Sequence, residues 1–303
     1  MSLHGPGLLG FRIAATSMEG LDWPTLDAVW AAAGELDVFS AGWMSDHLAD
    51  AGRNRGGVAF ESFTTAGALA HRVPGKWIGI AVASTTFRHP AVIAKAAAVL
   101  DNATGGRFIL GLGAGWHEGE HAAFGIPLPP ILERFDRYEH AVEVVHALFS
   151  SAGRGAPGVT RPDPFYPLDG ATIEPPTIRA GGPALWLGGQ RRRGIALAAR
   201  LADGWIMPGN MPGALEYFVD RRAAIVAALE GEGRDPADFG FAGQLVIAPD
   251  AAGLHAAREL ALRFVEAGAT HLTLGVMPDA GPDGLRDIAR EVAEPIRDAT
   301  GRA

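Results

Sequence analysis

Short apolar segments alternate with longer, helix-like segments along most of this chain. The apolar segments have the length of strands and show no polar alternation; they cover residues 10–15, 38–43, 77–83, 108–112, 184–187, 204–207, 241–247 and 271–275. The helix-like segments between them cover residues 24–36, 90–101, 132–149, 194–201, 213–229, 252–266 and 284–298. Apolar strands followed by helices are typical of a parallel sheet buried on both faces. Eight such strands predict a (β/α)8 TIM barrel, whereas a doubly wound sheet more often has about six.

Three long connections interrupt this alternation, at residues 48–76, 114–134 and 150–183. Long loops in a barrel are expected on its functional face, at the C-terminal ends of the strands. We therefore predict one α/β domain over residues 1–303, a TIM barrel with insertions at its C-terminal rim. Residues 150–183 are rich in glycine and proline, and we interpret them as an ordered excursion or a lid.

Composition narrows the class of protein. The chain has 303 residues, 48% of them hydrophobic and 20% charged, which is ordinary for a soluble globular protein with a large core. Its formal net charge of -8 argues against nucleic acid or an anionic membrane as the main partner. The absence of cysteine excludes disulfides, thiolate zinc sites, iron–sulfur clusters and a cysteine nucleophile, and it fits a cytoplasmic protein. No apolar run approaches the roughly 20 residues of a membrane span.

Polar and glycine-rich residues follow the predicted strands and should meet at one rim. Asp46 and His47 follow the second strand, and a carboxylate beside an imidazole can orient a proton donor or acceptor. The alternative is that Asp46 caps the next segment while His47 packs inertly. The other segments at this rim are 84–86, 113–116, 188–190 and 208–210.

Two glycine-rich strand ends are candidate cofactor contacts. Gly188-Gly189-Gln190 precedes a helix that contains Arg191, Arg192 and Arg193, and free N–H groups at such a helix start can bind phosphate. The alternative is a tight turn followed by a solvated basic helix end. Residues 111–115 read Gly-Leu-Gly-Ala-Gly, but Trp116 replaces the last glycine of the dinucleotide fingerprint. These glycines either let the strand bend sharply or let the backbone approach a ring system.

Residues 117–121, His-Glu-Gly-Glu-His, match the H-E-x-x-H signature of zinc peptidases. That signature needs a stable helix that places both imidazoles on one face, and Gly119 costs about 1 kcal/mol there relative to alanine. A zinc hydrolase that uses His117, Glu118 and His121 is therefore only a distant alternative.

These same segments resemble the luciferase-like monooxygenase superfamily. The similar stretches include residues 87–95 (FRHPAVIAK), 111–116 (GLGAGW) with Glu120-His121, 133–137 (ERFDR), 187–189 (LGG) and 198–205 (AARLADGW). Residues 43–47 (WMSDH) match as well, so the resemblance covers roughly the first two-thirds of the chain. It is closest to the branch that uses the deazaflavin coenzyme F420, in which an Asp-His pair ends the second strand.

The resemblance implies a TIM barrel that binds coenzyme F420, or alternatively FMN, at its C-terminal rim. His47 would contact the ring and manage a proton, oriented by Asp46. Some deazaflavin dehydrogenases carry an acidic residue where Trp116 stands, so Glu120 is the alternative acid–base group. The remaining implied cofactor contacts are a non-proline cis peptide near Ala81-Val82, Ser84 at the ring edge, Gly113, Ala114, Gly115 and Trp116 along the ring, and Gly188, Gly189 and Gln190 at the phosphate.

The implied activity is hydride transfer between coenzyme F420 and a small-molecule organic substrate. The alternative is an FMN-dependent monooxygenase that receives reduced flavin from a separate reductase. Family habit further implies a homodimer.

Overall fold

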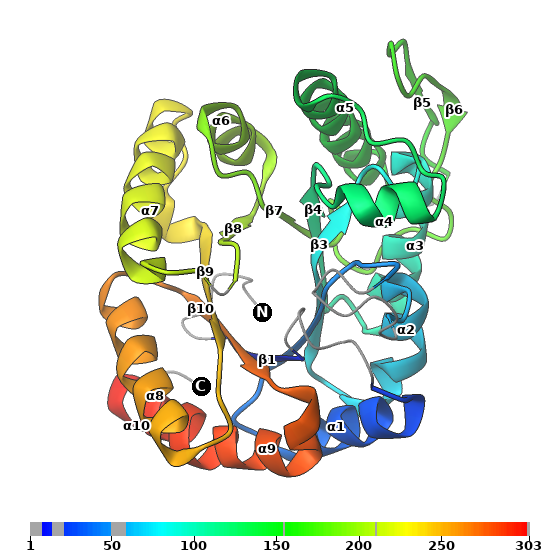
Figure 1. The fold of residues 1–303 in the computed structure, drawn as a ribbon. Helices are drawn as coiled ribbons and strands as arrows, with labels where there is room; N and C mark the ends of the chain where they lie inside the picture. Colours follow the sequence, from blue (N-terminus) through cyan, green and yellow to red (C-terminus); the bar gives the residue numbers. More distant parts are fainter. Residues whose placement is uncertain (1–7, 14–20, 50–58, 154, 210, 302–303) are drawn as a thin grey trace.

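Eight parallel strands close into a barrel (Figure 1). A computed structural model of the chain describes residues 8–13, 21–49, 59–153, 155–209 and 211–301. Around the barrel the strands follow the order β1-β10-β9-β8-β7-β4-β3-β2. Their bounds are β1 Leu8–Ile13, β2 Ala41–Met44, β3 Trp77–Ser84, β4 Phe108–Gly113, β7 Ala184–Leu187, β8 Gly204–Ile206, β9 Gly240–Val246 and β10 His271–Val276.

Helices surround the barrel on its outside (Figure 1). The α-helices are α1 Trp23–Glu35, α2 Ser62–Leu69, α3 Pro90–Ala103, α4 Glu118–Ala123, α5 Ile131–Ser150, α6 Arg192–Leu201, α7 Ala214–Gly231, α8 Ala251–Glu266, α9 Gly281–Ile288 and α10 Glu294–Thr300. Short 3-10 turns lie at η2 Ala70–Arg72, η3 Pro236–Asp238 and η4 Pro278–Ala280, and a π turn at η5 Ala289–Ala293. Among the described helices, none is both long and apolar enough to cross a membrane.

The predicted barrel is confirmed, with shifted boundaries. Strand β2 begins at Ala41 rather than at residue 38, because its pairing with β1 starts where Gly10 faces Ala41. Residues 14 and 15 of the first predicted strand lie outside the described residues. The last predicted helix is divided into α9, η5 and α10. Pro295 lies in the first turn of α10 and has no N–H for an i→i−4 hydrogen bond, which explains the change of helix type just before it.

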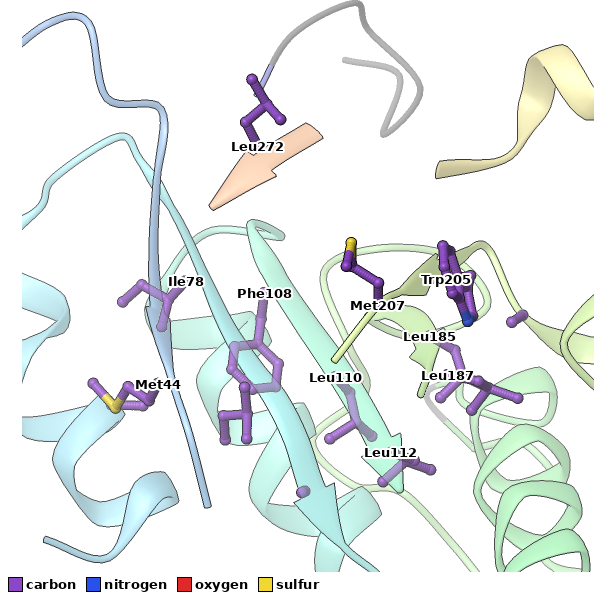
Figure 2. Close-up of a cluster of buried hydrophobic side chains, with 14 of the residues drawn as sticks. Met44, Ile78, Phe108, Leu110, Leu112, Leu185, Leu187, Trp205, Met207 and Leu272 are labelled. Carbon is purple, nitrogen blue, oxygen red and sulfur yellow. The ribbon is translucent and has the colours of Figure 1, made fainter. Parts of the chain in front are cut away.

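Apolar side chains on the outer faces of the strands form the main core against the helices. Phe108, Leu110 and Leu112 alternate along β4 with residues that point into the barrel, and all three are fully buried. Figure 2 shows them beside Leu185 and Leu187 of the neighbouring strand β7. This alternation explains why the strands read as continuous apolar runs, since both faces are covered.

Two tryptophans fill the inside of the barrel. Trp43 lies against Gly10 and Gly79, where a methyl group would be 2.3 Å from its ring at either position. Trp186 occupies the corresponding space beside Gly204 and Gly240, and the two indole centroids are 5.6 Å apart. These two indoles therefore pack the interior of the barrel below its C-terminal rim.

The excursion at residues 150–183 is not a lid. It contains the antiparallel strands β5 (Val159–Arg161) and β6 (Leu168–Ala171), which lie outside α5 (Figure 1). Asp163 holds it to α5 through His140 Nδ1 at 2.7 Å, and Lys95 of α3 donates to the Glu174 carbonyl at 2.5 Å. The connection leaves the end of a helix, so it starts at the opposite end of the barrel from the strand termini. From there it runs back to the rim side, where Tyr166 packs on His89, the N-cap of α3, with ring centroids 5.2 Å apart.

Candidate active site

A cavity of about 550 Å³ opens at the C-terminal ends of the strands. This volume is within the range of small-molecule and cofactor sites, roughly 300–1,000 Å³. Most of the predicted site residues line it: Asp46, His47, Ala81, Val82, Ser84, Gly113, Ala114, Gly115, Trp116, Glu120, Gly188 and Gln190. The tertiary structure thus brings together residues from β2, β3, β4, α4 and β7 that are up to 144 positions apart, from Asp46 to Gln190.

Glu120 contacts the imidazole of His47 on one wall of this cavity. His47 Nδ1 lies 3.1 Å from Glu120 Oε2, and the two side chains are 15% and 1% exposed. The other carboxylate oxygen accepts hydrogen bonds from the backbone N–H groups of Leu48 and Ala49. One buried carboxylate on α4 therefore holds both the ring and the backbone that follows β2.

These hydrogen bonds determine the charge of Glu120 and the tautomer of His47. Burial raises the pKa of the Glu120 carboxyl, but hydrogen bonds from His47, Ala49 and Leu48 outweigh burial, and the pKa lies below its ordinary value. An ionised carboxylate only accepts hydrogen bonds, so His47 Nδ1 must carry the proton. In the neutral ring the lone pair is then on Nε2, which has no hydrogen-bond partner among the described residues.

Asp46 does not orient His47, contrary to the expectation from sequence. Its fully buried carboxylate accepts two hydrogen bonds from Arg88, at 2.7 and 2.9 Å. It also accepts from the Ser62 hydroxyl at 2.7 Å and from the Ser84 backbone N–H at 2.9 Å. Arg88 contacts Glu61, the N-cap of α2, as well. Asp46 therefore ties the end of β2 to the end of β3 and to α2.

The end of β3 has an irregular backbone. The peptide bond between Ala81 and Val82 is cis, which confirms the expectation from the resemblance, and the register with β4 shifts between Ile80 and Ala83. Val82 points toward the glycines of the neighbouring strand: a methyl group on Gly113 would lie 2.5 Å from Val82 Cγ2. At this position the glycine makes room for a side chain of the adjacent strand.

Side chains fix every carbonyl of the Gly188–Gln190 turn. The Gln190 amide donates to the Gly188 carbonyl, the Trp205 indole donates to Gly189 at 3.1 Å, and Arg221 donates to Gln190 at 3.1 Å. Trp205 is fully buried, so it belongs to the core. Gly189, the one predicted site residue outside the cavity lining, packs against the helix instead: a methyl group there would be 2.6 Å from the Gly194 Cα.

Helix α6 begins directly after this turn and has no side-chain cap. Its first N–H groups are therefore available to an anion. Arg193 is paired with Asp136 and Glu139 of α5, whereas the side chains of Arg191 and Arg192 are exposed. Of the three arginines, Arg193 is held by α5, and Arg191 and Arg192 are exposed at the start of α6.

The His-Glu-Gly-Glu-His segment is only partly helical, because the short helix α4 begins at Glu118 and leaves His117 outside it. His117 is the N-cap of α4 and accepts from the Glu120 N–H at 2.9 Å, so its Nδ1 is already engaged. Both ring nitrogens of His121 are engaged too, with Thr86 and with the His117 carbonyl. Within the described part of the chain, no three His, Cys, Asp or Glu side chains gather in a way that could hold a metal ion. The described residues therefore offer no metal-ligand cluster that would support the zinc-hydrolase alternative.

Sequence reasoning missed the residues that support the site. From the sequence, Arg88 is expected only to lie where the chain leaves a strand, but in the structure it pairs with the Asp46 carboxylate. The only sequence feature that marks it is its place just before His89-Pro90, where α3 begins. Gln244 of β9 lines the cavity from inside an otherwise apolar strand, and its buried Oε1 atom has no hydrogen-bond partner in the part of the chain that the structure describes. A lone glutamine in a buried strand is a signal that could have been used.

Solved structures share this fold. An F420-dependent secondary alcohol dehydrogenase, solved with an F420–acetone adduct, superposes with a TM-score of 0.76 and 19% identity, covering 95% of this chain and 99% of that one. The EDTA monooxygenase of Chelativorans sp. BNC1 superposes with a TM-score of 0.76 and 15% identity, covering 98% and 95%. At these identities the likeness establishes the fold.

The relatives found by sequence have a higher sequence identity to this chain than these solved structures, and they are longer proteins. A phthiodiolone/phenolphthiodiolone dimycocerosates ketoreductase of Mycobacterium tuberculosis (strain ATCC 25618 / H37Rv) is 33% identical over 183 residues, 58% of this chain and 44% of that protein. An F420-dependent glucose-6-phosphate dehydrogenase of Nakamurella multipartita is 34% identical over 178 residues, 58% of this chain and 50% of that protein. The matches thus span about half the length of these relatives. The family model for luciferase-like monooxygenases matches residues 15–300, and the chain therefore belongs to that family.

Proposed function

We propose that this protein is an oxidoreductase that transfers a hydride between coenzyme F420 and a small organic substrate. The observation that carries the proposal is the His47–Glu120 pair on the wall of the cavity, with Nδ1 held at 3.1 Å from a buried carboxylate. The F420-dependent glucose-6-phosphate dehydrogenase among the relatives supports this choice of cofactor.

The residues present fit a phosphorylated ring of this kind. Ala81 and Val82 give one wall an apolar surface against which a planar ring can pack. The uncapped start of α6, with Arg191 and Arg192 exposed beside it, suits a phosphate group. The unpartnered Oε1 of Gln244 offers a hydrogen-bond acceptor to a polar ring edge. When bound, the ring would supply the two-electron chemistry.

His47 would manage the proton of the substrate. With Nδ1–H directed at Glu120, the free lone pair on Nε2 can accept the hydroxyl proton of an alcohol as its carbon loses a hydride. In the reverse direction the imidazolium returns that proton to a carbonyl oxygen. The ionised Glu120 stabilises the imidazolium and holds the ring, as a carboxylate does for a catalytic histidine elsewhere. The substrate itself remains unspecified beyond a small organic molecule.

A second candidate is an FMN-dependent monooxygenase supplied with reduced flavin by a separate reductase. The fold shared with the EDTA monooxygenase favours it, because the same strand ends can hold either ring. We also propose that the protein forms a homodimer and receives its reduced cofactor from a separate reductase.

The test is a fluorescence titration of the purified protein with coenzyme F420 and with FMN, each oxidised and reduced. Tight F420 binding that His47→Ala weakens supports hydride transfer, and the exposed His255 on α8 provides the matched control, His255→Ala. Preference for reduced FMN, with oxygen consumed on mixing, would support the monooxygenase. Binding of neither cofactor would refute both.

A further inference from the structure

A second hydrogen-bonded chain begins and ends on the wall of the cavity, at Ser84 and His121, and is separate from the His47–Glu120 pair. Ser84, which lines the cavity, places its Oγ atom 2.6 Å from Thr86 Oγ1. Thr86 Oγ1 lies 2.7 Å from His121 Nε2, and His121 Nδ1 lies 2.8 Å from the His117 carbonyl oxygen. Ser84 and His121 are 6% and 2% exposed, so little water competes for these bonds.

The direction of each bond in this chain follows from its last acceptor. A carbonyl oxygen can only accept, so His121 Nδ1 must carry a proton. In the neutral ring Nε2 then has the lone pair, and the Thr86 hydroxyl donates to it. Since the Thr86 proton is used there, the Ser84 hydroxyl donates to Thr86. Ser84 Oγ can then only accept a hydrogen bond from a ligand in the cavity.

Protonation of His121 reverses the two bonds that involve hydroxyl groups, while Nδ1–H still donates to the His117 carbonyl. Nε2–H then donates to Thr86, Thr86 donates to Ser84, and the Ser84 proton becomes free to point into the cavity. We propose that Ser84, Thr86 and His121 form a proton relay that serves the cofactor, distinct from the pair that serves the substrate. The identity of the cofactor rests on the proposed function; the direction of the chain rests on geometry alone.

The proton balance is simple. A ligand that accepts a hydride gains two electrons, one hydrogen nucleus and one negative charge. Ser84 gives it the compensating proton, Thr86 replaces the proton of Ser84, and His121 Nε2 replaces that of Thr86. His121 ends neutral, and in the reverse reaction it ends as the imidazolium. No other reactant is needed.

The surroundings hold the relay in place. Gly115, with φ of +76°, brings its backbone so close that a methyl group would lie 2.5 Å from Thr86 Oγ1 and 2.7 Å from Ser84 Oγ. The Phe87 ring packs on His121, with centroids 4.8 Å apart. His121 also lies on the wall of a second cavity, between α4 and the start of α5. The titratable and charged groups that share either cavity with His121 are Asp46, His47, His117, Glu118, Glu120 and Arg134.

The first test needs no cofactor. In ¹⁵N-labelled protein, nitrogen chemical shifts should identify neutral His121 as the Nδ1–H tautomer, with assignment by comparison with His121→Gln. An Nε2–H tautomer would overturn the relay. This measurement decides the matter even if the protein binds neither F420 nor FMN, a result that would overturn the proposed function alone.

The second test measures the coupling of binding to protons. The ratio of the dissociation constants for oxidised and reduced cofactor is followed from about pH 5 to 8, the range in which imidazoles titrate. One proton carried by the relay changes this ratio by about tenfold per pH unit beyond the ligand's own titration. Thr86→Val and His121→Gln should both remove that part of the slope. The matched control is Thr85→Val, since the neighbouring hydroxyl donates to the Gly113 carbonyl, outside the relay. An unchanged slope in Thr86→Val would overturn the proposal.

Discussion

Arg88→Met tests how much the ion pair between Arg88 and the buried Asp46 contributes to the free energy of unfolding. The Asp46 carboxylate is fully buried and Arg88 is 16% exposed, so the substitution leaves a charge inside the protein without a counter-ion. Removal of one partner from a buried pair typically costs about 3–5 kcal/mol. Asp46 keeps hydrogen bonds from Ser62 and from the Ser84 N–H, which places the expected loss at the lower end, about 3 kcal/mol. That is a large part of the roughly 5–15 kcal/mol by which a domain is stable.

The assay is urea unfolding followed by circular dichroism. A double-mutant cycle with Asp46→Asn should give a coupling energy of at least about 2 kcal/mol, because the double variant buries no unpaired charge. The control is Arg290→Met, whose side chain is 63% exposed and pairs with Asp287; no measurable change in the free energy of unfolding is expected there. If Arg88→Met lowered the free energy of unfolding by less than about 1 kcal/mol, which is the effect of removing an exposed ion pair, the reasoning from burial would be wrong.

Three further predictions follow from single contacts. Gly113→Ala should lower the free energy of unfolding by about 1–3 kcal/mol and weaken cofactor binding, because the new methyl group would lie 2.5 Å from Val82. The control is Gly231→Ala, which has open space around it and should leave the free energy of unfolding unchanged in the same assay. Burial raises the pKa of the Asp163 carboxyl, but hydrogen bonds from His140 and from the N–H groups of Phe165 and Tyr166 lower it by a larger amount, so that the pKa is about 2. A carboxyl whose folded pKa is depressed stabilises the protein above its unfolded pKa, so about 2 kcal/mol should be lost as the pH falls from about 4 to about 2, and Asp163→Asn should abolish this dependence in acid unfolding curves. Arg191→Gln should weaken binding of FMN or coenzyme F420 by about tenfold, while the dephosphorylated form of the same cofactor binds as before; equal weakening of both forms would remove the arginine from the phosphate site.

The sequence by itself determined the barrel and its approximate strands. Apolar runs such as 108–112 must be covered on both sides, and their order with intervening helices leaves few ways to bury them all. Position relative to a strand end also identified most of the cavity lining, since the ends of parallel strands share one rim. Asp46, Ser84, Gly113 and Gly188 were all found in this way.

Only the tertiary structure decided which polar groups pair. The neighbour of His47 in sequence is Asp46, yet the carboxylate that reaches its imidazole is Glu120, 73 positions away. Asp46 is turned instead toward Arg88, and Thr86 toward His121. Side chains of adjacent residues in an extended segment point to opposite sides, so closeness along the chain does not predict contact. The excursion at residues 150–183 shows the same limit: its length is visible in the sequence, but its position outside α3 and α5 is set by long-range contacts such as His140–Asp163.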